Sequence, residues 1–184
     1  LAFISTSNAW VSEFPSVDNL DNMLSFNPTR VYASDKKTVL AEFQLDDRIP
    51  VPSNDKIAQS AHDATLAIED ERFYVHHGID LPGIFRALFV TIFSSNREGA
   101  STITQQLVRN TLLSNEMSII SIKRKVREAY LATEIGDRYD KQKILLLYMN
   151  TVNYGSGAYG IETASNRYFS KSSKDLTISE SAAL

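Results

Sequence analysis

The sequence predicts a mainly α-helical domain preceded by a short β-prone arm. Its 184 residues contain only 7 glycines and 5 prolines, against typical usage of about 7% and 5%. Such a shortage of turn-forming residues favours long helices over many short strands. From residue 53 onward, apolar residues recur at spacings of three and four, which is the period of a helix with one buried face.

Residues 1–45 form the arm. Short strands are predicted at 30–33 and 39–43, because both runs are rich in β-formers and the turn-like Asp35, Lys36 and Lys37 separate them. The prolines at 50 and 52 bias their predecessors away from the helical region, so 49–52 is predicted to be an extended connector.

The first helix is predicted at 57–68, with Asn54 or Asp55 as its N-cap, and the second is predicted to begin after Asp80. The first has an apolar stripe, made of Ile57, Ala61, Ala64 and Ile68. The second is apolar nearly all the way round over 84–93. Such a helix is either fully buried or dips into a membrane surface, and composition alone favours burial.

The other helices are marked by caps and dense apolar runs. A third begins at Ser101 or Thr102, where Thr102 and Gln105 fit a capping box, and its buried stripe is Ile103, Leu107 and Thr111. A fourth is predicted at 119–137, with these residues inward: Ile122, Val126, Ala129 or Tyr130, and Thr133. The others are 141–151, 161–169 and a last helix capped by Thr177 and Glu180.

Composition also excludes several classes of protein. The absence of cysteine excludes a disulfide framework, a thiol nucleophile and a thiolate zinc site. A formal net charge of −3 argues against a general nucleic-acid partner. Between residues 97 and 127, however, basic residues outnumber acidic ones, which indicates either a local anionic ligand or a solvated helix face.

Three adjacent carboxylates, Glu69, Asp70 and Glu71, end the first helix. They are either a solvated helix end or the source of a general base. Glu69 lies at the edge of the apolar stripe, so we expect it in a partly buried groove, where burial and neighbouring negative charge raise a carboxyl pKa. The following His76 and His77 could be metal ligands, but a core role is favoured for His76, with its ring bonded to backbone.

Two further segments combine polar groups at helical spacing. Residues 99–106 place hydroxyls and two glutamines at a helix N-terminus, whose free N–H groups suit phosphate or sugar oxygens; capping alone also explains part of this pattern. Arg124, Lys125 and Glu128 share one helix face. They form either an exposed salt bridge or a site where cations meet an anionic leaving group and Glu128 holds the cations or a metal.

Taken in order, these segments resemble the motifs of the family 51 glycosyltransferases, the peptidoglycan glycosyltransferase domain of class A penicillin-binding proteins and their monofunctional relatives. The resemblance covers about residues 46–184, with a fifth motif cut short at 180–184. The first four motifs are matched by Glu69-Asp70-x-x-Phe73-x-x-His76-x-Gly78, Gly99-x-Ser101-Thr102-x-Thr104-Gln105-Gln106, Arg124-Lys125-x-x-Glu128, and Lys141-x-x-Ile144-Leu145-x-x-Tyr148-Met149-Asn150 with Gly155.

The resemblance implies a lysozyme-like helical domain at 46–184, truncated at its C-terminus, with a membrane-proximal jaw at about 79–122. It implies polymerisation of lipid II into glycan strands, with Glu69 as general base and Glu128 beside the donor diphosphate. A divalent cation, Mg²⁺ or Mn²⁺, is expected at Glu128. The implied substrate-binding residues are Ser101, Thr102, Gln105, Gln106, Arg109, Lys123, Arg124 and Lys125. The implied structural residues are Asp70, Phe73, His76, Gly78, Gly99, Tyr148 and Asn150.

The implied partners are lipid II, the growing glycan strand and the membrane surface, which the apolar helix at 84–93 would contact as part of the jaw. The β-prone arm is similar to that of bifunctional class A proteins. We therefore expect a transmembrane helix before residue 1, a transpeptidase domain after residue 184, and a location on the outer face of the cytoplasmic membrane. The alternatives are a lysozyme-like glycan hydrolase and a non-catalytic membrane-associated scaffold.

Overall fold

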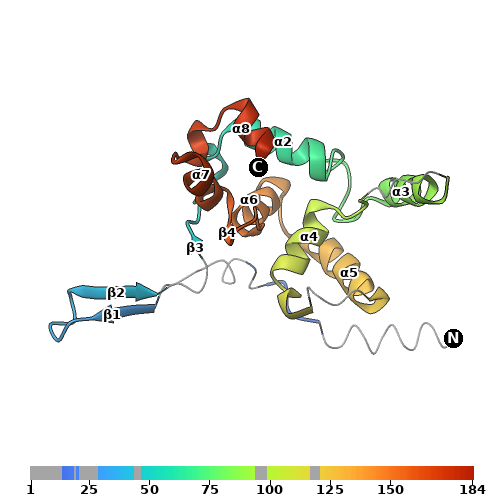
Figure 1. Ribbon diagram of the computed structural model, residues 1–184. Coiled ribbons are helices and arrows are strands. Elements are labelled where there is room, and N and C mark those ends of the chain that lie inside the picture. The colour runs from blue at the N-terminus through green and yellow to red at the C-terminus, as the bar shows by residue number, and fades with distance from the viewer. Residues whose placement is uncertain (1–13, 19, 21–28, 44–46, 94–98, 117–120) are drawn as a thin grey trace.

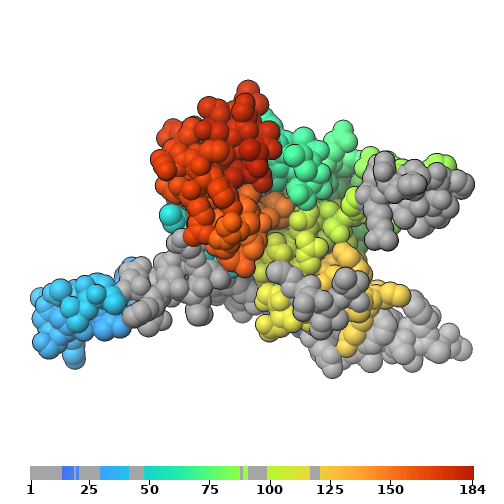
Figure 2. Space-filling model, in the orientation of Figure 1, coloured from blue at the N-terminus to red at the C-terminus, as the bar shows by residue number. Residues whose placement is uncertain are grey.

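A computed structural model describes residues 14–18, 20, 29–43, 47–93, 99–116 and 121–184. It confirms the predicted fold class: a helical body carries a two-stranded hairpin on one side and a projecting helix, α3, on the other (Figure 1). The hairpin stands clear of the body in the space-filling view (Figure 2).

The hairpin consists of β1 (Thr29–Tyr32) and β2 (Val39–Phe43), which pair antiparallel. The Asp35 carboxylate closes the turn between them by accepting hydrogen bonds from the backbone N–H groups of Lys37 and Thr38, each at 2.9 Å. Bonds from the Thr38 hydroxyl and these N–H groups lower the pKa of Asp35 to about 2. The predicted strands and turn are therefore confirmed.

The connector that follows is held to the body by strand pairing and by hydrogen bonds with side chains. The short strand β3 (Asp47–Arg48) pairs in parallel with β4 (Ala158–Tyr159), a contact that the sequence did not reveal. The side-chain amide of Asn150 then forms two hydrogen bonds with the backbone of Val51, accepting from its N–H at 2.7 Å and donating to its carbonyl at 3.0 Å. These two bonds satisfy the backbone N–H and carbonyl groups of Val51. Its neighbours Pro50 and Pro52 have no N–H to donate, so the segment cannot form a continuous ladder of strand hydrogen bonds.

The core lies where α4 (Ile103–Asn110), α5 (Ile122–Arg138) and α6 (Lys141–Thr151) pack together. Leu107, Leu131 and Ile144, one from each helix, are almost fully buried, and each such side chain stabilises the fold by about 1.5–3 kcal/mol. Around this centre, α2 (Gln59–Glu69) packs against α8 (Ile178–Ala183), and α7 (Ile161–Phe169) contacts α6.

The bounds predicted for 141–151 and 161–169 agree with α6 and α7, and both capping boxes are present. The first helix begins later than predicted. A 3₁₀ turn, η2 (Asn54–Lys56), precedes α2, whose N-cap is Ala58, so neither Asn54 nor Asp55 caps it. The predicted stripe also ends early, because Ile68 is 72% exposed.

The predicted buried face of α5 is wrong. Ile122 and Val126, assigned inward, are exposed, and the N-terminal half of the helix instead buries charged residues: Arg124, Arg127 and Glu128. Apolar packing takes over only in the C-terminal half, at Leu131, Ala132 and Ile135. The apolar pattern misled the prediction because ion pairing, not hydrophobicity, determines which residues are buried in the first two turns.

Helix α3 (Leu81–Phe93) presents large apolar side chains to solvent. Leu81, Phe85 and Phe89 are each at least 60% exposed, so burial, the alternative that composition favoured for 84–93, is wrong for Phe85 and Phe89. None of the helices in the described ranges combines the length and apolarity needed to cross a bilayer.

Candidate active site

The three adjacent carboxylates at the end of α2 lie in different surroundings. Glu69 and Glu71 are exposed, whereas Asp70 is buried. Glu69 lines two neighbouring cavities, one mostly apolar beside Tyr148 and one polar beside Ser101. The expected groove is therefore present, but the expected partial burial of Glu69 is not.

Glu69 is oriented by a side chain from α4. The Gln106 amide donates a hydrogen bond from Nε2 to Glu69 Oε2 at 2.5 Å. The opposite end of the same amide accepts from the Tyr148 hydroxyl of α6 at 3.3 Å. Gln106 was expected to bind sugar hydroxyls; in this structure its amide instead lies between Glu69 and Tyr148.

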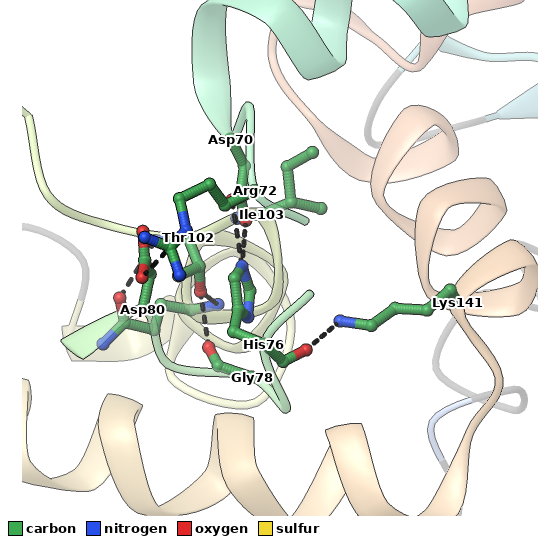
Figure 3. A network of polar contacts seen from close by, with 9 residues as sticks. Asp70, Arg72, His76, Gly78, Asp80, Thr102, Ile103 and Lys141 are labelled. Carbon is green, nitrogen blue, oxygen red and sulfur yellow. Dashed lines mark hydrogen bonds and ion pairs between the residues drawn. The ribbon is translucent and has the colours of Figure 1, made fainter. Parts of the chain in front are cut away.

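Asp70 fastens the loop after α2 to the start of α4, as Figure 3 shows. Its carboxylate is bonded by His76 Nε2 at 2.9 and 3.0 Å and by the backbone N–H of Ile103 at 3.0 Å. The ring of His76 was expected to form a hydrogen bond with the backbone, and this prediction is wrong. The ring bonds the Asp70 carboxylate instead, which is buried because it also accepts from an N–H group that the start of α4 leaves without a partner. The backbone carbonyl of His76 accepts from Lys141 Nζ at 2.5 Å.

The loop is closed against α4 and α5 at Gly78. Thr102, the N-cap of α4, donates from its hydroxyl to the Gly78 carbonyl at 2.6 Å while accepting from the Gln105 N–H. Gly78 has φ +89°, and a Cβ at this position would lie 2.1 Å from the Ala132 carbonyl oxygen. Only glycine permits this approach of the loop to α5.

A buried charged cluster lies at the start of α5. Glu128 is fully buried, with Arg124 Nε 3.1 Å from Oε1 and Lys125 Nζ 2.7 Å from Oε2. These contacts are ion pairs by distance rather than well-aligned hydrogen bonds. Lys125 Nζ also lies 2.9 Å from the Ser101 hydroxyl, which joins the cluster to the polar cavity that Glu69 lines. The interpretation of this helix face as an exposed salt bridge is therefore wrong, because Glu128 is fully buried.

Other predicted site residues lie close to this region or on its edge. Arg109, on α4, is half-buried and its charge lowers the pKa of Tyr148, although burial of the phenol dominates and raises it overall. Lys123 is exposed on α5. Phe73 is fully buried under Lys141, whose Nζ lies 4.4 Å from the ring centroid. Burial also lowers the pKa of Lys141, against an opposing effect of Asp70.

The described residues do not fit a divalent cation held by the protein. They contain no group of three or more His, Asp or Glu side chains placed to share an ion, and both oxygens of Glu128 are paired with cationic side chains. His76 is bonded to Asp70, and His77 is exposed. Charge at this site is balanced by arginine and lysine, and the expected metal remains a prediction.

Sequence patterns did not reveal two contacts of this site. The Tyr148–Gln106 bond joins positions 42 residues apart, and the Lys141–His76 bond joins positions 65 residues apart. Neither follows from helical periodicity, because the first depends on how α4 and α6 pack and the second on how the loop after α2 packs against α6. The only signal was the presence of Tyr148 and Lys141 in the fourth motif.

The structure is a mainly helical domain in which the Glu69 carboxylate lines a polar cavity, and comparison with known proteins identifies its class. The Transglycosylase family model matches residues 36–184, and the chain belongs to this family. It is 48% identical over 158 residues to penicillin-binding protein 1A of Haemophilus influenzae (85% of this chain, 18% of the relative). It is 46% identical over 158 residues to that of Rickettsia bellii (84% and 19%), and 42% identical over 179 residues to that of Clostridium tetani (95% and 22%). The chain thus spans about a fifth of the length of these relatives.

Proposed function

We propose that this domain polymerises lipid II into glycan strands. As a member of the transglycosylase family, the chain is a peptidoglycan glycosyltransferase. The observation that carries the proposal is the position of Glu69, an oriented carboxylate at a cleft edge. The polar side of that cleft is linked through Ser101 to Lys125, which pairs with the buried Glu128.

In the proposed reaction, Glu69 accepts the proton of the acceptor's 4-hydroxyl. The freed oxygen attacks the anomeric carbon of the growing strand from the face opposite the lipid diphosphate. A glycosidic C–O bond forms, the C–O bond to the diphosphate breaks, and the bonding electrons leave with the diphosphate. The configuration at the anomeric carbon is therefore inverted.

The leaving diphosphate needs neutralisation of charge more than protonation, because its conjugate acid is strong. We assign this role to Arg109, Lys123, Arg124 and Lys125. Glu128 fixes the geometry of two of these cations, and preorganised charges of this kind stabilise a transition state without reorganising during the reaction. The proposed reaction assigns no step to the expected Mg²⁺ or Mn²⁺. A loss of activity on adding a chelator would show that a metal ion takes part.

A hydrolase of the lysozyme type is less consistent with the site. It needs a carboxylic acid to protonate a sugar oxygen and a second carboxylate at a defined separation. Glu128, the second glutamate of the motifs, is fully buried between Arg124 and Lys125, so it is not placed to protonate a sugar. A non-catalytic scaffold does not require an oriented carboxylate, so the hydrogen bond from Gln106 to Glu69 favours the enzyme over this alternative.

We further propose a setting on the outer face of the cytoplasmic membrane. The relatives are several times longer than this chain and are named penicillin-binding proteins, which supports a transpeptidase domain and an anchoring helix elsewhere in the protein. The exposed Leu81, Phe85 and Phe89 of α3 give the domain an apolar surface suited to lipid.

The test uses two substrates with the full-length protein. Labelled lipid II should give glycan ladders with stoichiometric release of the lipid diphosphate, whereas preformed glycan without lipid should remain uncut. Cleavage of the polymer, or folded protein that leaves lipid II unchanged, would overturn the proposal.

A further inference from the structure

We infer that Tyr148 is a positioning residue for Glu69, acting through the side-chain amide of Gln106. This inference rests on the proposed function, because it takes Glu69 as the base. The three side chains come from α6, α4 and α2, and they are joined by hydrogen bonds of 3.3 Å (Tyr148 to Gln106) and 2.5 Å (Gln106 to Glu69).

The chemistry of the three groups fixes the direction of both bonds. An ionised carboxylate can only accept, so the Gln106 atom facing Glu69 must be the amide nitrogen. The amide oxygen then faces Tyr148 and can only accept, so the phenol must donate. A glutamine amide by itself can be turned either way round; here the two end groups allow only one orientation.

Tyr148 is suited to hold that orientation. It is only 2% exposed, so its ring is fixed by packing. Burial raises the pKa of its hydroxyl, and the negative charge of Glu69 raises it further. The phenol therefore remains protonated, and remains a donor, throughout the range in which Glu69 would act as a base.

The consequence for the reaction concerns which carboxylate oxygen is used. The amide occupies Oε2 of Glu69, so Oε1 is assigned to the acceptor hydroxyl. Because Glu69 lies at an exposed helix end, its rotamer is not set by burial. Without the Tyr148 hydroxyl the amide still turns its nitrogen toward the carboxylate, but it loses its second hydrogen bond, so Gln106 and the carboxylate it holds are free to adopt other rotamers.

The test compares Tyr148→Phe with Tyr154→Phe in the full-length protein, with lipid II as substrate. Tyr154 lines the same cavity, and its hydroxyl is buried with no hydrogen-bond partner in the described part of the chain, so it is the matched control. We expect Tyr148→Phe to lower kcat by roughly 3- to 10-fold, the loss typical of one hydrogen bond, with KM within twofold. The acidic limb of its pH–rate profile should move to higher pH. Tyr154→Phe should remain within twofold of wild type in both constants.

A double-mutant cycle separates positioning from packing. Gln106→Met removes the amide that connects the two groups and should itself lower kcat by about 10- to 100-fold. On that background, adding Tyr148→Phe should have no further effect, because the two residues act through one connection. A Tyr148→Phe effect of undiminished size on the Gln106→Met background, or wild-type kcat and pH profile in Tyr148→Phe alone, would overturn the inference.

Failure of this inference can be distinguished from failure of the proposed function. If wild type makes glycan ladders and Glu69→Gln does not, while Tyr148→Phe matches Tyr154→Phe, the function holds and Tyr148 is only a packing residue. If wild type makes no product from lipid II, both claims fail together.

Discussion

The carboxylate of Asp70 accepts a hydrogen bond from the backbone N–H of Ile103 at 3.0 Å, across 33 positions of the chain. Asp70 directly follows Glu69 at the end of α2, and Ile103 is the first residue of α4, the helix that carries Gln106. The bond satisfies one of the N–H groups that every helix start leaves without a partner. A single buried side chain therefore supports both the proposed base and the residue that orients it.

Asp70→Asn should loosen this support. An amide has one accepting oxygen in place of two, so it cannot accept from His76 and Ile103 as the carboxylate does. We expect the free energy of unfolding to fall by about 1–3 kcal/mol and kcat to fall because Glu69 is less well placed. Denaturant unfolding measures the first effect. Asp63→Asn, an exposed carboxylate on the same helix, should change the stability by less than about 0.5 kcal/mol; equal losses in the two variants would contradict the role of Asp70.

Gly78→Ala should destabilise the fold severely. Its φ of +89° is unfavourable for alanine, and the new Cβ would lie 2.1 Å from the Ala132 carbonyl oxygen. We expect a loss of about 3 kcal/mol or more, as is typical where backbone must move. Gly99→Ala is the matched control, since nothing lies within 4 Å of a Cβ there. A thermal midpoint for Gly78→Ala equal to that of Gly99→Ala would show that the loop does not pack against α5 as described.

Glu128→Gln should affect both turnover and stability. It leaves Arg124, which is 7% exposed, without its buried counter-charge, and breaking a buried pair in this way costs about 3 kcal/mol. We expect weaker binding of the lipid-diphosphate donor and a lower rate. The control is Glu134→Gln on the same helix, whose ion pair with Arg138 is solvent-exposed and contributes less than about 1 kcal/mol. Unchanged donor affinity and rate in Glu128→Gln would reject its assigned role.

His62 should contribute to acid sensitivity. Burial lowers its pKa below the ordinary value of 6.5, and Lys174 adds to this effect while Asp63 opposes it. Because the pKa is lower in the folded state, the unfolded state binds this proton more tightly. The stability from neutral His62 is therefore present above pH 6.5 and is lost as the pH falls through the lower folded pKa.

Denaturant unfolding at several pH values between 7.5 and 5 tests this sign. The stability of His62→Leu should depend less on pH over that range than the stability of wild type. His77→Gln, at an exposed position, should retain the wild-type slope. A His62→Leu curve parallel to that of wild type would show that another group causes the acid sensitivity.

Local sequence signals predicted the elements whose ends are set locally. The capping boxes at Thr102 and Thr177, and the turn at Asp35, involve residues two or three positions apart, so their chemistry can be read from sequence. The start of α6 is also set locally, because the Asp140 side chain accepts from the Lys143 N–H, whereas α7 follows Gly160, which has a positive φ and no side-chain cap.

The errors occurred where distant contacts decide the outcome. Hydrophobic spacing placed Ile122 and Val126 of α5 inward, but the ion pairs around Glu128 rotate that face toward solvent. The position of Glu69 at a cleft was predicted, whereas its exposure and its bond to Gln106 were not, because both depend on how α2 and α4 pack. Among the three adjacent carboxylates, the sequence pattern singled out Glu69 as the partly buried one, whereas the fold buries Asp70 and leaves Glu69 and Glu71 exposed.

The central claim is that Glu69 is the general base of lipid II polymerisation. The most direct measurement is the rate of glycan formation by Glu69→Gln against wild type, in full-length protein with labelled lipid II, with thermal unfolding as a check that both are folded. Loss of a general base lowers rates by about 10²- to 10⁴-fold, so we predict a loss of at least that size with an unchanged thermal midpoint. A folded Glu69→Gln protein that kept more than about a tenth of the wild-type rate would contradict the claim, because a base supplies more than that factor.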